Sequence, residues 1–260
     1  MQRLSRLILL LILAGAAFLG WHFREPLADL YHKIVNRSAS GENDPRKGTP
    51  DPVRYQELIK ELEAKRLDLS KQYQQARTAQ DITRVIRDSR KTLDEFLPAM
   101  MRCWLGTDWD LNGTCSTPGS GKIACGYFVS TILQDAGFKV ERYKLAQQAS
   151  QKIIGTFLPR NQMHVRAGKS YDDFLQEVVS RGPGIRIVGL DKHVAFLVVQ
   201  EDSSIRFIHS SGGEPYCVVD EGRHNATALK NSKYRVTGEI TGNDDVIHRW
   251  LIGDRWPTQL

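Results

Sequence analysis

Apolar residues recur at spacings of three and four between residues 53 and 101, and this pattern predicts long amphipathic helices. Leu58, Leu62 and Leu69 mark the first stripe, and a second stripe runs from Ile82 to Met100. The polar stretch 76–81 predicts a turn between two helices, with Asp81 as the N-cap of the second. We expect residues 53–101 to form a helical hairpin that packs on the rest of the protein, or a coiled-coil stalk that joins two copies.

The pattern changes after residue 101. A glycine-rich loop at 106–122 precedes an amphipathic run from Ala124 to Ala136, and Gly137 is a typical residue to end that helix. Further helical spacing occurs at about 144–154 and 171–180. Short runs rich in β-branched and apolar residues then predict six strands: GIRIVGL, HVAFLVVQ, SIRFIHSS, YCVVD, YRVTGEI and VIHRWLIG.

Helices followed by a series of antiparallel strands predict an α+β fold, with the helix that begins near residue 124 packed on one face of the sheet. We expect residues 102–260 to form this domain. The composition of the whole chain agrees with this: 41% of the 260 residues are hydrophobic and 25% are charged, as in globular proteins with one main core.

The first 24 residues have the pattern of a signal anchor or a cleaved signal peptide. Arg3 and Arg6 precede an apolar stretch at 7–20, which is followed by Trp21 and Arg24. Either form places the rest of the chain across the membrane, so we expect a protein anchored in an inner membrane and facing the periplasm or another extracytoplasmic space. Residues 25–52 are largely polar and predict a flexible linker.

The net charge of +6 comes from scattered basic residues, so no nucleic-acid partner is expected. An extracytoplasmic compartment is usually oxidising, and the pair Cys103 and Cys115, which brackets a loop, is the best candidate for a disulfide among the four cysteines. Cysteines and histidines do not occur at the spacings of a zinc site, so we expect neither a metal nor a cofactor.

Cys125 lies where the predicted helix 124–136 begins. Unpaired backbone N–H groups and the positive end of the helix dipole favour the thiolate there, and Ala124 and Gly126 leave space around the sulfur. These features predict a nucleophile, whereas the alternative is a buried core thiol.

A nucleophilic thiol needs a base, and the base needs a partner that fixes its tautomer. His193 precedes a strongly apolar strand, and His209 lies on the next predicted strand. Because side chains alternate along a strand, an odd number of residues in the connection places His209 on the face of His193, whereas an even number places Ser210 there. We favour His209 and keep Ser210 as the alternative.

The segments CGYFV and HVAFLVV, preceded by WDLNGT, resemble the NlpC-like branch of the papain fold, a family of bacterial cell-wall cysteine peptidases. The resemblance covers about residues 104–212. It implies that Cys125 attacks an amide carbonyl, that His193 transfers the proton and that His209 orients His193. It also implies an oxyanion site made by the Cys125 N–H and Trp109, next to Gly126.

The resemblance implies that the substrate is peptidoglycan or another amide, cleaved by a cysteine peptidase or amidase. The long separation between Cys125 and His193 predicts an inserted helical piece that narrows the cleft. Two alternatives stay open: an acyltransferase that uses the same thiol, and an envelope scaffold without catalytic activity.

Overall fold

The computed structural model describes residues 48–258, which belong to one compact unit. The predicted membrane segment 1–24 and most of the predicted linker 25–52 lie outside these residues. Within residues 48–258, the helices are too short or too polar to cross a bilayer.

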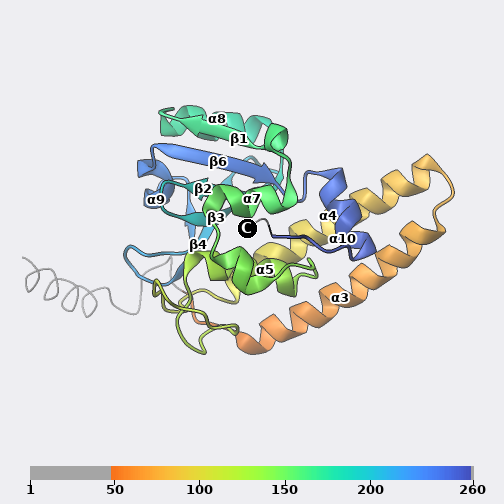
Figure 1. Ribbon diagram of the computed structural model, residues 1–260, viewed down its shortest axis with the longest axis horizontal. Helices are drawn as coiled ribbons and strands as arrows, with labels where there is room; N and C mark the ends of the chain where they lie inside the picture. Colours follow the sequence, from red (N-terminus) through yellow and green to blue (C-terminus); the bar gives the residue numbers. More distant parts are fainter. Residues whose placement is uncertain (1–47, 259–260) are drawn as a thin grey trace, which may run out of the picture. The chain divides into compact units, whose positions relative to one another are not determined.

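The centre of the fold is a six-stranded antiparallel sheet, which confirms the predicted α+β class (Figure 1). The strands pair in the order β1-β6-β2-β3-β4-β5. Their bounds are β1 His164–Ala167, β2 Gly184–Leu190, β3 Val194–Val199, β4 Ile205–Ser210, β5 Val218–Gly222 and β6 Tyr234–Glu239. The central strands β2 and β3 are buried along their whole length, because helices cover both faces of the sheet.

One face of the sheet carries the larger core. Alternate strand residues such as Ile187, Phe196 and Ile208 pack with helices α5 (Cys125–Asp135) and α7 (Ser150–Phe157). The opposite face presents Leu197 and Phe207 to α8 (Tyr171–Ser180) and the short helix α9 (Thr227–Asn231). The alternation of side chains along β3 and β4 therefore divides the domain into two cores.

Helices α3 (Pro52–Gln75) and α4 (Ala79–Arg102) form an antiparallel hairpin whose apolar stripe is buried in the larger core. The Tyr55 hydroxyl donates to Asp135 Oδ2 of α5 at 2.8 Å, and its ring meets Trp104 edge-on. Further along α3, the Arg66 side chain reaches the Trp250 carbonyl of α10 (Asp244–Ile252). The hairpin thus packs within the chain, as the first of the two sequence interpretations expects.

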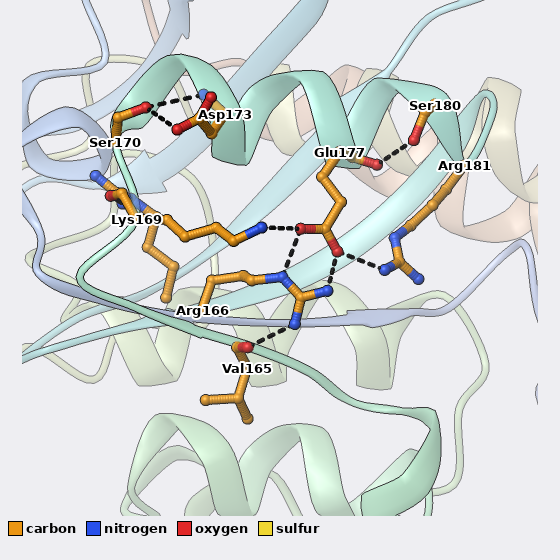
Figure 2. A network of polar contacts seen from close by, with 9 residues as sticks. Val165, Arg166, Lys169, Ser170, Asp173, Glu177, Ser180 and Arg181 are labelled. Atoms are coloured by element: carbon orange, nitrogen blue, oxygen red, sulfur yellow. Dashed lines mark hydrogen bonds and ion pairs between the residues drawn. The ribbon is translucent and has the colours of Figure 1, made fainter.

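An ionic cluster fixes α8 over the edge strand β1 (Figure 2). Glu177 of α8 accepts hydrogen bonds from Arg166 of β1, from Lys169 and from Arg181. These contacts, with Arg166 first, lower the pKa of the Glu177 carboxyl to about 2. The carboxylate is therefore charged at neutral pH and ties α8 to the sheet edge through charge-assisted hydrogen bonds.

Several expectations from the sequence are wrong in detail. The N-cap of α4 is Thr78, whose hydroxyl oxygen accepts from the Asp81 N–H, so Asp81 stands three residues into the helix. The run at 246–253 forms helix α10 instead of a strand, since an apolar run this short fits either period. Its start is capped by Asn243, and Gly253 ends it in a left-handed conformation.

Two other regions differ from the expected pattern. The helix expected at 144–154 is split into α6 (Arg142–Ala146) and α7, and strand β1 was not predicted. The helix at 171–180 matches α8, and the helix that ends before Gly137 matches α5.

The proposed Cys103–Cys115 disulfide is absent, because all four cysteines are free thiols.

Leu62 and Leu67 provide a matched test of whether α3 is an integral part of the fold. The Leu62 side chain is 1% exposed and the Leu67 side chain is 55% exposed on the same helix. We expect Leu62→Ala to lower the free energy of unfolding by about 2–5 kcal/mol, because it leaves a cavity in the core. Leu67→Ala should change it by less than about 0.5 kcal/mol in urea denaturation. Equal, small effects would mean that α3 is not part of the cooperative unit.

Candidate active site

The loop before α5 is held in place by pairing and by one buried arginine. The amide of Ile123 donates to the Asp108 carbonyl at 2.9 Å, and the amide of Ala124 donates to the Gly113 carbonyl at 2.8 Å. These bonds bring the chain to the first turn of α5. Cys125 is therefore the first helical residue, as the sequence predicts.

Arg142 of α6 ties this loop to α5. Its guanidinium donates to the Thr131 hydroxyl at 2.6 Å and to the carbonyls of Thr114 and Cys115 at 2.9 and 2.7 Å. The rings of Tyr127 and Tyr143 lie 5.1 Å from the guanidinium carbon, within the range of cation–π attraction. A buried charge is costly unless hydrogen-bond acceptors and aromatic rings surround it. The Arg142 guanidinium therefore holds the loop in a fixed position relative to α5.

Gly126 has a packing reason to lack a side chain. A Cβ atom at this position would lie 2.2 Å from the Ala146 carbonyl oxygen, so only glycine lets α6 approach α5 this closely. The sequence interpretation placed Gly126 beside the substrate, and the residue does line a small cavity next to the sulfur. Its contact with α6 is the stronger constraint on the residue type.

His193 immediately precedes β3, at the end of the tight β2–β3 hairpin. The Leu190 amide donates to the His193 carbonyl at 2.8 Å, which closes the turn. Asp191 in this turn accepts from the Ser232 hydroxyl and the Lys233 amide, both at 2.8 Å. The histidine is therefore carried by a turn that is attached to the chain segment leading into β6.

The register of the sheet joins His193 to His209. Residues 200–204 connect β3 to β4, and Val199 pairs with Ile205, so His209 lies on the same face as His193. His193 Nε2 lies 2.8 Å from His209 Nδ1, a hydrogen-bonding distance. Ser210 lies on the opposite face, where its hydroxyl donates to the Ile123 carbonyl at 2.6 Å. The geometry therefore selects His209 over Ser210 as the neighbour of His193.

The structure adds a residue that the sequence interpretation missed. Glu221 of β5 is 4% exposed, and its Oε2 lies 3.2 Å from His209 Nε2. It falls on the face of His209 because His209 pairs with Val219 and side chains alternate along β5. An acidic residue at the end of an apolar strand was the visible signal in the sequence, but the pairing register decides its neighbour.

A cavity of about 680 Å³ brings these groups together. Its walls include the predicted site residues and the new acidic one: Trp109, Cys125, His193, His209 and Glu221. A smaller cavity of about 240 Å³ is also lined by Cys125 and His193, together with Gly126, Ala146 and Ala149. Cys125 and His193 therefore line both cavities.

Trp109 lies over the loop that follows β4. Its amide donates to the Tyr216 carbonyl at 2.8 Å, and its ring rests against Gly212. A Cβ atom at Gly212 would lie 2.9 Å from the indole, so a larger residue there would displace the ring. Trp109 therefore has a defined place on the cavity wall, where its indole N–H can donate a hydrogen bond.

Burial reverses the expected protonation of the sulfur. Desolvation raises the pKa of the Cys125 thiol, although the backbone N–H groups of Val194, Gly126 and Cys125 act in the opposite direction. The Val194 contact also places the sulfur beside the first amide of the His193 strand. The prediction that the helix start makes Cys125 a thiolate is wrong for the resting protein, because the loss of water outweighs the N–H groups.

Both imidazoles are neutral at neutral pH. Desolvation lowers the pKa of His193 to about 3, with a further contribution from His209, and desolvation also lowers the pKa of His209 to about 3. Within residues 48–258, no hydrogen bond connects the Cys125 sulfur with the His193 ring. The resting site therefore holds a neutral thiol next to a neutral base, and an attacking thiolate must form by proton transfer.

The other three cysteines are less suited to nucleophilic chemistry. Cys103 and Cys217 are buried, and desolvation raises the pKa of Cys103 to about 11. Desolvation also raises the pKa of Cys115, which is half-buried. Among the four thiols, Cys125 alone lines the cavity with the two histidines.

The comparisons with known proteins add no assignment. No family model, no curated protein and no solved structure matches this chain. The interpretation of the site therefore depends on its geometry and on the sequence motifs.

The protonation state of Cys125 can be measured by alkylation. We expect the rate of modification by iodoacetamide, followed for each cysteine by mass spectrometry, to rise with a midpoint above about 8.5, the ordinary pKa of a cysteine thiol. The reason is that burial disfavours the thiolate. The Cys125→Ala variant identifies signals from the other cysteines. A midpoint below pH 7 would instead indicate a resting thiolate–imidazolium pair.

Proposed function

We propose that this protein is a cysteine hydrolase of the bacterial envelope that cleaves a peptide or amide bond. The observation that supports this most strongly is the 2.8 Å contact between His193 Nε2 and His209 Nδ1 beside a cavity that Cys125 also lines. A nucleophile, a base and a group that orients the base are the three parts that nucleophilic amide cleavage needs.

The first half of the reaction forms a thioester. The Cys125 sulfur attacks the carbonyl carbon while its proton passes to His193, and a sulfur–carbon bond forms. The negative charge on the carbonyl oxygen is stabilised by the Cys125 N–H, one of the first amides of α5, which have no partner within the helix. His193 then gives its proton to the leaving nitrogen as the carbon–nitrogen bond breaks.

Water completes the reaction. It attacks the thioester carbon, its proton passes to His193, and the carbon–sulfur bond breaks. The proton then returns to the sulfur, so the products are an amine and a carboxylic acid, and the enzyme is unchanged. The neutral resting state of both groups suits this cycle, because His193 can accept a proton in each half of it.

The arrangement of elements supports the NlpC-like, papain-type assignment. Cys125 begins a helix packed on an antiparallel sheet, His193 precedes a central strand, and its partner lies on the next strand. Helices α6 and α7 lie between them in the chain, where the sequence predicted an inserted piece, and Ala146 and Ala149 line the smaller cavity. Peptidoglycan is the substrate that this resemblance and the predicted membrane anchor favour.

The walls of the larger cavity suit a peptide with polar groups. Trp109 and Leu111 give an apolar rim, with Leu111 73% exposed, and Lys192, Glu214 and Asn231 supply polar contacts. Mixed walls of this kind bind peptide stems better than a long acyl chain, which needs a continuous apolar surface. The hydrolase therefore takes precedence over the acyltransferase alternative.

Incubation with purified sacculi tests the proposal. We expect the full-length protein to release muropeptides and Cys125→Ala to release none, while Cys115→Ala keeps wild-type turnover because Cys115 lies outside the cavity. Loss of the nucleophile should lower the rate by at least about 10³-fold. Chromatography with mass spectrometry identifies the new amine and carboxylic acid ends.

The same experiment separates the alternatives. If wild type and Cys125→Ala are equally inert, the hydrolase proposal on peptidoglycan is contradicted and the scaffold interpretation is favoured. If Cys125 acquires a stable acyl group and the sacculi stay intact, the protein is an acyltransferase.

A further inference from the structure

A continuous row of polar atoms runs from His193 through His209 to Glu221. His209 Nδ1 faces His193 Nε2 at 2.8 Å, and His209 Nε2 faces Glu221 Oε2 at 3.2 Å. His209 is 1% exposed and Glu221 4% exposed, so water has little access to either contact. Each contact must therefore hold one proton, supplied by one of the two atoms that it joins.

If the Glu221 carboxyl group is ionised, it determines the direction of the whole row. It can only accept, so His209 Nε2 must carry a proton and donate it to Glu221. A neutral imidazole has one N–H, so His209 Nδ1 must then accept from His193 Nε2. His193 is neutral as well, and its remaining nitrogen, Nδ1, is left with a free lone pair.

The opposite direction would disable the base. If a donor replaced the carboxylate, His209 Nε2 would accept, His209 Nδ1 would donate to His193 Nε2, and the proton of His193 would move to Nδ1. His193 would then have no free nitrogen outside the row with which to take the Cys125 proton. The tautomer of His193 thus depends on a side chain two hydrogen bonds away.

We propose that Glu221 is ionised and is a positioning residue that fixes the tautomers of His209 and His193, so that His193 Nδ1 is the base for Cys125. This inference rests on the proposed hydrolase function, but its structural part concerns the protons alone. Glu221 acts through His209 and need not touch the substrate. A buried carboxylate costs stability in a sheet that could hold an apolar residue here, and the direction of the row supplies a reason for its presence.

Three substitutions separate charge from shape. Glu221→Gln keeps the size but adds an amide N–H₂ that can donate to His209, whereas Glu221→Asp keeps an acceptor-only group on a shorter side chain. Glu201→Gln makes the same chemical change at an exposed residue of the β3–β4 connection and is the matched control. Unfolding curves identify any variant that fails to fold.

Long-range ¹H–¹⁵N correlation spectra of the histidine rings report which nitrogen carries the proton. In the wild type at pH 7 we expect protonated Nε2 and bare Nδ1 on both His193 and His209, assigned with His193→Gln and His209→Gln. Glu221→Asp should keep this pattern. Glu221→Gln should introduce the Nδ1-protonated form of both rings.

The activity assay adds a second readout. On sacculi, Glu221→Gln should lower kcat by about 10²-fold with little change in KM, as expected when a general base is mispositioned, and Glu201→Gln should be unchanged. Glu221→Asp should recover part of the loss, which a purely structural role for the larger side chain would not produce.

The two proposals fail in different ways. An Nδ1 proton on His193 in the wild type, or full activity with wild-type tautomers in Glu221→Gln, would overturn the role of Glu221 and leave the hydrolase proposal intact. A wild type that shows the expected tautomers but cleaves nothing would contradict the hydrolase proposal alone.

Discussion

The hydrogen bond between His193 and His209 is the contact on which the site depends. It joins a turn to a strand, and it exists because five residues connect β3 to β4 and keep both rings on one face of the sheet. A shift of the register by one residue would place Ser210 there instead. The sheet is therefore more than a support for the helices: its pairing decides which side chain contacts the base. The helix that carries Cys125 packs on the other face of the sheet. The sulfur lies beside the Val194 amide at the start of β3, where it lines the same cavity as His193.

Burial explains both the order and the chemistry of the site. The rings are rigid because Phe207 lies against them, with its centroid 4.3 Å from that of His209, and because helices cover the sheet. The same lack of water keeps both imidazoles neutral and the Cys125 thiol protonated. A protonated thiol is a weak nucleophile, so the resting site is less prone to oxidation than a thiolate would be. Arg142 and Gly126 serve this arrangement indirectly, since they hold the preceding loop and α6 against α5.

The sequence predicts the parts of the site that depend on local pattern. The start of α5, its end before Gly137 and the strands on either side of 200–204 follow from periodicity. The choice between His209 and Ser210 stayed open in the sequence, and the odd length of that connection, seen in the structure, decides for His209. Glu221 could not be placed, because its neighbour depends on the β4–β5 register, which no local pattern specifies. The same limit explains the wrong pairing of Cys103 with Cys115, since proximity along the chain does not imply proximity in space. The sequence predicted a strand where α10 lies, because a run of eight mostly apolar residues is too short to distinguish a strand period of two from a helix period of 3.6.

In the proposed mechanism, His193 activates Cys125 toward a carbonyl-like electrophile. The most direct measurement is tandem mass spectrometry of the full-length protein after treatment with a peptidyl acyloxymethyl ketone, which alkylates a thiol activated by a neighbouring base. We expect the adduct to form on Cys125, the other three cysteines (Cys103, Cys115 and Cys217) to stay unmodified, and His193→Ala to abolish labelling. Labelling of Cys115 instead, or equal labelling of Cys125 with and without His193, would contradict it.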